Sequence, residues 1–114
     1  MKIGIVGLGS IGRRHSKILL SKGISVSALR TNQGTLQELS TDLLGITQYT
    51  DSKAFYAQNL DGVIICNPTS HHFKSTVAAL DNCSAIFVEK PFVNTLAEAK
   101  LIPENAQSKI VVAF

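Results

Sequence analysis

The chain has 114 residues, of which 45% are hydrophobic and 17% are charged, and its formal net charge is +3 at pH 7. This size and composition fit one globular domain with an apolar core. The basic residues are scattered, apart from Arg13 and Arg14, and no apolar run approaches the length of a membrane span, so neither a nucleic-acid nor a membrane partner is expected. A cytoplasmic location follows by elimination.

Apolar runs alternate with helical patterns along the whole chain. Strands are expected at 2–7, 24–29, 46–50, 61–66, 84–89 and 109–114. Helices are expected at 10–23, 35–44, 52–58, 71–82 and 95–106, with Pro103 bending or ending the last. Every connection is too long for a hairpin, so the strands must be joined by crossovers in a mostly parallel sheet. The sequence therefore predicts a single α/β domain with a doubly wound (Rossmann) sheet of about six strands.

A GxGxxG motif lies between the first strand and the first helix, where it is specific for dinucleotide binding. Gly7 would allow the sharp turn, Gly9 would let a pyrophosphate approach the backbone, and Gly12 would let the helix pack close to the sheet. Ser10 and Ile11 belong to the helix N-terminus, whose free N–H groups would face the anion. We predict that these five residues bind the cofactor phosphates.

The second strand ends in Arg30, Thr31 and Asn32. A site for NAD usually has Asp or Glu here to accept hydrogen bonds from the ribose. A methyltransferase would also use a glycine loop after its first strand, but it too would be expected to have an acidic residue here, so this class is disfavoured. An arginine instead can donate to a 2′-phosphate, so the sequence favours NADP, with NAD possible. The alternative is a solvated arginine in a domain that accepts both cofactors.

Two further motifs follow the fourth and fifth strands. The first runs from Cys66 through Asn67, Pro68, Thr69, Ser70 and His71 to His72, and the second is Glu89-Lys90-Pro91. The glycine motif extends as GxGxxGxxH to His15. Together they resemble the N-terminal domain of the Gfo/Idh/MocA family, which includes glucose-fructose oxidoreductase and inositol dehydrogenase. The resemblance covers the whole chain, and its three motifs arrive in the expected order at the expected strand ends.

The resemblance implies an NAD(P)-dependent oxidoreductase that acts on a sugar, a cyclitol or a related polyol. It implies that Lys90 is the catalytic residue, which would reach the reacting hydroxyl and the nicotinamide ribose. Pro91 would shape the loop that presents Lys90, and Glu89 would position Lys90 or contact the cofactor. A partly desolvated lysine beside a cationic nicotinamide would have a lowered pKa and assist proton transfer.

The motif after the fourth strand departs from the usual sequence of the family at this place. Asn67 stands where Thr is usual, Thr69 stands where Asn is usual, and His72 matches the family histidine. By the resemblance, Asn67, Pro68, Thr69 and His72 would line the nicotinamide side of the site. His71 and His72 point about 100° apart at the start of a helix and have no evident third partner, so no metal is expected.

His15 and the two cysteines fit structural roles better than chemical ones. His15 falls among the apolar positions of the first helix, where packing is favoured over a cofactor contact. Cys66 and Cys83 have apolar neighbours and no metal-ligand spacing, so they are expected to be buried free thiols.

In the family, the sixth strand leads into a second domain that carries most substrate contacts and the acid-base residues. Residues 1–114 are therefore expected to be the dinucleotide-binding domain of a longer parent enzyme, itself a homo-oligomer, whose C-terminal substrate domain is absent. Alone, this part would bind NADP weakly and turn nothing over. Two alternatives stay open: a glycosidase of the same family that uses its nicotinamide transiently, and a non-catalytic nucleotide-sensing module.

Overall fold

The structure is a computed structural model, and it describes residues 1–30, 40–68, 71–90, 100–101 and 109–112. The chain alternates between strands and helices along these residues. In order, the elements are β1 (Lys2–Val6), α1 (Ser10–Ser21), β2 (Ser25–Leu29), the 3₁₀ turn η1 (Thr41–Leu43), β3 (Thr47–Tyr49), α2 (Ser52–Tyr56), β4 (Gly62–Ile65), α3 (His72–Leu80), β5 (Ile86–Val88) and β6 (Ile110–Val112).

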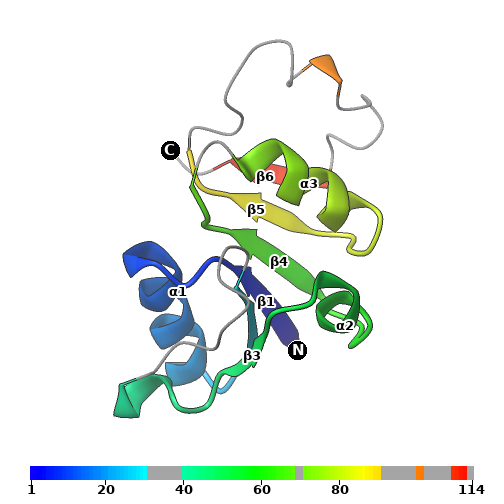
Figure 1. Cartoon of the computed structure of the whole chain (residues 1–114). Coiled ribbons are helices and arrows are strands. Elements are labelled where there is room, and N and C mark those ends of the chain that lie inside the picture. The colour runs from blue at the N-terminus through cyan, green and yellow to red at the C-terminus, as the bar shows by residue number, and fades with distance from the viewer. Residues whose placement is uncertain (31–39, 69–70, 91–99, 102–108, 113–114) are drawn as a thin grey trace.

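The six strands form one parallel sheet in the order β3-β2-β1-β4-β5-β6 (Figure 1). The chain first winds outward from β1 to β3, and then crosses back to β4 and winds the other way. The predicted doubly wound sheet is thus confirmed. The direction reverses between β1 and β4, and ligands of such sheets bind at the carboxyl ends of the strands at this point.

Alternating residues of the strands feed two separate apolar clusters, because the side chains of a strand point to opposite faces of the sheet. One cluster lies under α1 and η1 and contains Ile5, Leu8, Val26, Ala28, Leu43 and Ile46. The other lies under α2 and α3 and contains Val6, Leu29, Phe55, Leu60, Val63, Ile65, Ala79, Cys83, Ile86 and Val88. Helices therefore cover both faces, and Figure 1 shows α1 and α2 on opposite sides of β1.

The helix predicted over 35–44 is wrong in its last part. Ser40 has an extended backbone, with ψ 161°, and the chain then makes a 3₁₀ turn in which Leu43 alone is buried. An extended residue interrupts the i to i+4 hydrogen bonds, so no continuous α-helix runs through this position. Residues 35–39 and most of the helix predicted at 95–106 lie outside the described residues. None of the helices that the structure describes is long and apolar enough to cross a membrane.

Candidate cofactor-binding site

The carboxyl edge of the sheet is continued by one backbone hydrogen bond beyond each of four strands. The amides of Gly7, Arg30, Cys66 and Glu89 donate to the carbonyls of Leu29, Tyr49, Val6 and Ile65, at 3.0, 2.8, 2.8 and 3.0 Å. These bonds align the residues that follow β1, β2, β4 and β5 along one edge. The three motifs of the sequence are brought together there.

The bend between β1 and α1 depends on the absence of side chains. Gly7 has φ +96°, and a Cβ there would lie 2.8 Å from the backbone nitrogen of Asn67. A Cβ on Gly12 would lie 2.0 Å from the carbonyl oxygen of Gly7. A Cβ on Gly9 would meet nothing within 4 Å. The turn and the close packing predicted for Gly7 and Gly12 are therefore present, and Gly9 faces free space.

The N-terminus of α1 suits an anion. Gly9 is the N-cap residue and provides no side-chain cap, and the first turn of the helix contains no acidic residue. The first backbone N–H groups of a helix have no partner within the helix, so they bind anions well. Ser10 and Ile11 are exposed in this first turn, and Arg13 and Arg14 are exposed beside it.

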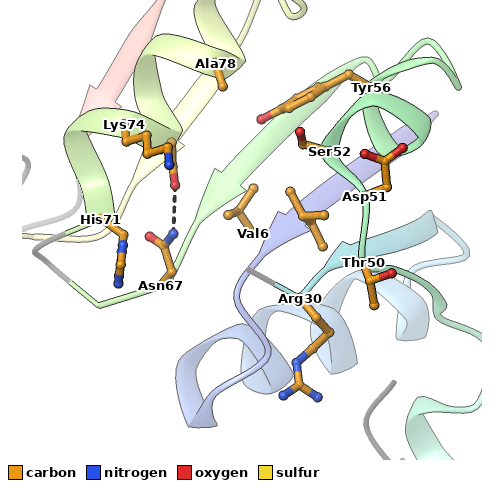
Figure 2. Close-up of a pocket in the computed structure, with 12 residues that line it drawn as sticks. Val6, Arg30, Thr50, Asp51, Ser52, Tyr56, Asn67, His71, Lys74 and Ala78 are labelled. Carbon is orange, nitrogen blue, oxygen red and sulfur yellow. Dashed lines mark hydrogen bonds between the residues drawn. The ribbon is translucent and has the colours of Figure 1, made fainter. Parts of the chain in front are cut away.

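A pocket of about 370 Å³ lies beside the bend, between α2, α3 and the carboxyl ends of β1, β2 and β4 (Figure 2). Its lining includes Arg30, Asp51, Tyr56, Asn67, His71 and Lys74. The sequence motifs predicted no cofactor role for Asp51, Tyr56, His71 or Lys74. Asp51 and His71 each follow a strand end, which is the signal that marks this edge, whereas Lys74 and Tyr56 enter from helices.

The acidic residue of this pocket is already engaged by its own helix. The carboxylate of Asp51 caps α2 by accepting hydrogen bonds from the amides of Lys53 and Ala54, at 3.4 and 3.2 Å. Arg30 and Lys74 are the lysine and arginine of the lining, and neither forms an ion pair with another described residue. The pocket therefore presents cationic side chains beside an acid whose oxygens are partly occupied.

Asn67 is held firmly at the start of the loop after β4. Its side chain is 5% exposed and donates from Nδ2 to Oγ of Ser75 at 2.7 Å, while its carbonyl accepts a hydrogen bond from Nε2 of His72 at 2.6 Å. Its Oδ1 has no hydrogen-bond partner within the part of the chain that the structure describes. His72, which is 2% exposed, thus holds the start of the loop through this hydrogen bond. The unpaired oxygen is an acceptor that a ligand donor would satisfy.

Glu89, which follows β5, links this strand to α1. Oε1 of Glu89 lies 2.6 Å from Nε2 of His15, and the His15 ring packs edge-on against Phe87 at 5.9 Å. His15 thus has the packing role that its apolar spacing predicted. Lys90, the next residue, is exposed.

A sequence profile described as "Oxidoreductase family, NAD-binding Rossmann fold", that of Gfo/Idh/MocA, matches residues 1–114. The chain belongs to the Gfo/Idh/MocA oxidoreductase family. The resemblance drawn from the three motifs is confirmed.

Members of the Gfo/Idh/MocA family resemble most or all of the chain. Myo-inositol 2-dehydrogenase of Thermotoga maritima is 27% identical over 100% of the chain and 35% of its own length. The inositol 2-dehydrogenase/D-chiro-inositol 3-dehydrogenase of Halalkalibacterium halodurans is 31% identical over 83% of the chain and 29% of its own length. The crystal structure of Lactobacillus casei myo-inositol dehydrogenase with NAD(H) and myo-inositol has a TM-score of 0.82 and 26% identity, over 98% of the chain and 36% of its own. The chain spans about a third of the length of these relatives.

The predicted site residues fall into groups within the structure. Gly7, Gly9, Ser10, Ile11 and Gly12 form the bend, and Arg30 and Asn67 line the pocket with the exposed Pro68 beside them. His72 is buried and bonds to the Asn67 carbonyl, and Glu89 and Lys90 follow β5. The predicted site residues Thr31, Asn32, Thr69 and Pro91 lie outside the described residues. Cofactor contacts by any of these residues stay predictions.

Cys83 is buried in one apolar cluster, and Cys66 is half-buried against the other. Both are free thiols. Burial, and secondarily the negative charge of Glu89, raises the pKa of Cys66 to about 12, and burial also raises the pKa of Cys83. Among the described residues, no three His, Cys, Asp or Glu side chains gather in a way that could hold a metal ion.

Proposed function

We propose that the chain is the nucleotide-binding domain of an enzyme that transfers a hydride between NADP and a sugar, cyclitol or related polyol. The observation that carries the proposal is the uncapped N-terminus of α1, where Gly9 leaves free space at the switch point of the sheet. The unpaired Oδ1 of Asn67 and the neighbouring pocket of about 370 Å³ also fit a bound dinucleotide. Several relatives are named as inositol dehydrogenases, which supports a polyol substrate.

Each part of the carboxyl edge would have a separate task. The amides of the bend bind the diphosphate, and the end of the pocket at Arg30 takes the adenosine half. The nicotinamide supplies the hydride chemistry when the cofactor is bound. Lys90, exposed at the end of β5, would hold or move a proton at the substrate hydroxyl. The remaining acid-base residues would come from a substrate domain, so residues 1–114 alone would bind cofactor without turnover.

The preference for NADP depends on Arg30. Its amide is tied to the carbonyl of Tyr49 at 2.8 Å, which places the arginine at the end of β2, where the adenosine ribose is expected. A guanidinium can bind a 2′-phosphate through two hydrogen bonds. Lys74 lines the same pocket and adds a second positive charge, while Asp51 is engaged in capping α2.

Isothermal titration of the chain with NADP⁺ and NAD⁺ tests this proposal. We expect weak binding of both, with NADP⁺ the tighter, and a loss of roughly tenfold in NADP⁺ affinity for Arg30→Leu with little change for NAD⁺. Lys22→Leu, at the far end of α1, removes the same charge and should change neither affinity. An absence of heat with both dinucleotides would contradict the binding site, and tighter binding of NAD⁺ would contradict the role of Arg30 alone.

The remaining partners follow from the same proposal. We expect a cytoplasmic, homo-oligomeric whole protein that acts on a small molecule and binds neither nucleic acid nor membrane. The scattered basic residues and the absence of a long apolar run in the sequence support this expectation.

A further inference from the structure

The order of the strands indicates where the nicotinamide would lie, if the proposed function holds. Arg30 marks the adenosine end, beyond β2, and the glycine bend that would bind the diphosphate follows β1. On the other side of β1 lie β4 and β5. A dinucleotide that crosses the carboxyl edge therefore places its nicotinamide half near the ends of β4 and β5, where Cys66 and Glu89 are located.

Glu89 is held in this position by contacts on two sides. Its amide donates to the carbonyl of Ile65 in β4 at 3.0 Å, and its side chain contacts His15 of α1 at 2.6 Å. A carboxylate only accepts hydrogen bonds, so Nε2 of His15 must carry the hydrogen. The carboxylate is thus fixed between the strand end and the helix that begins at the bend.

The carboxylate of Glu89 lies near the carboxyl edge of the sheet and is partly exposed. The side chain of Glu89 is 19% exposed and that of His15 is 26% exposed, so the pair lies at the surface rather than in the core. Among the described residues, Glu89 forms no ion pair with a lysine or an arginine. Burial first, and secondarily the negative charge of Glu89, raises the pKa of Cys66 at the end of β4.

We propose that Glu89, held by His15, makes this domain prefer the oxidised cofactor over the reduced one. The nicotinamide ring carries a positive charge in NAD(P)⁺ and none in NAD(P)H. A fixed negative charge near the ring stabilises the first form and has no comparable interaction with the second. Glu89 is then a specificity determinant, and His15 is a positioning residue that acts through it.

The test is the ratio of two dissociation constants, that of the reduced cofactor divided by that of the oxidised one, measured by titration calorimetry on the chain. Glu89→Gln keeps the size of the side chain and an oxygen that accepts from His15, so the fold should persist, which a thermal melt will check. We expect this ratio to fall on the order of fivefold in Glu89→Gln. Glu89→Asp keeps the charge and His15→Gln keeps a donor, so both should stay near the wild-type ratio.

Asp81→Asn is the matched control, because it removes a carboxylate at the end of α3, away from the carboxyl edge. Its ratio should equal that of the wild type. Equal weakening of both cofactor forms in Glu89→Gln would indicate a merely structural role and overturn the inference. A fall in Glu89→Asp as large as in Glu89→Gln would also overturn the assignment to the negative charge of the carboxylate. If the wild type binds neither form, the proposed function itself fails.

Discussion

The bend after β1 and the loop after β4 lie against each other at the carboxyl edge, but they are built in opposite ways. The bend has its shape because Gly7 and Gly12 lack side chains. The described residues of the loop are held because Asn67 and His72 have side chains that are buried and hydrogen-bonded. The two meet where Gly7 approaches the backbone of Asn67.

This difference predicts how each region responds to change. At Gly7 and Gly12, one added methyl group would meet backbone atoms of the bend or of the loop. In the loop, removal of one side chain leaves polar atoms without partners but creates no clash. The bend should therefore be the more sensitive of the two to added side-chain atoms, and the loop should be the more sensitive to the removal of a side chain.

Gly12→Ala is expected to have the largest effect. Its Cβ would lie 2.0 Å from the Gly7 carbonyl oxygen, so α1 must move away from the bend. We expect a loss of about 3 kcal/mol or more in the free energy of unfolding, measured by urea denaturation. A near-wild-type stability would contradict the close packing at this contact.

Gly9→Ala is the matched control in the same bend. Its Cβ would meet nothing within 4 Å, and Gly9 has φ −73°, which any residue adopts. The free energy of unfolding should change by less than about 1 kcal/mol. The added methyl group would instead occupy space that the diphosphate needs, so dinucleotide affinity should fall.

His72→Ala tests the loop and should have the next largest effect. It removes a 2% exposed side chain that donates to the carbonyl of Asn67 at 2.6 Å. The cavity and the unpaired carbonyl together should cost about 2–4 kcal/mol of unfolding free energy. His71→Ala removes the neighbouring exposed imidazole, which caps no amide, and should cost little in the same denaturation experiment.

The sequence predicted the bend better than the loop, for the same physical reason. The conformation of a glycine motif depends on its own residues and can be predicted from their spacing. The structure has the positive φ of Gly7 and the close approach of Gly12 that this spacing indicates. The doubly wound sheet was also predictable, because buried parallel strands are continuous apolar runs. His72, in contrast, matched a family motif, but the motif did not indicate that the ring of His72 would bond to the carbonyl of Asn67.

Contacts between distant segments could not be predicted from the sequence. His15 and Glu89 are 74 residues apart, and their hydrogen bond exists because α1 and β5 come together in the fold. Lys74 reaches the pocket from α3 for a similar reason. The last part of the helix predicted over 35–44 is wrong because Ser40 is extended and interrupts the pattern there.

Alkylation of Cys66 would sharpen the comparison, because this residue lies between the bend and the loop. With its pKa raised from 9.0 to about 12, the thiol should react with iodoacetamide at least about a hundredfold more slowly in the folded chain than in urea at pH 8.5. Cys83→Ser leaves Cys66 as the single reporter. Glu89→Gln should speed the reaction of the folded chain, because it removes the secondary cause of the raised pKa. An unchanged rate would show that burial alone protects the thiol.

The smallest effect is expected at the ion pair of Lys17 and Asp42, which links the middle of α1 to η1 at 3.0 Å. Hydrogen bonds from Ser40 and then from Lys17 lower the pKa of Asp42 from its usual 3.8. A lowered carboxyl pKa adds stability above pH 4 that is lost as the pH falls below it. Both side chains are exposed, so the contribution should be small and screened by salt. Asp42→Asn should therefore melt within experimental scatter of the wild type at pH 7, and a large shift would show that this pair, rather than the packing at Gly12, holds α1 in place.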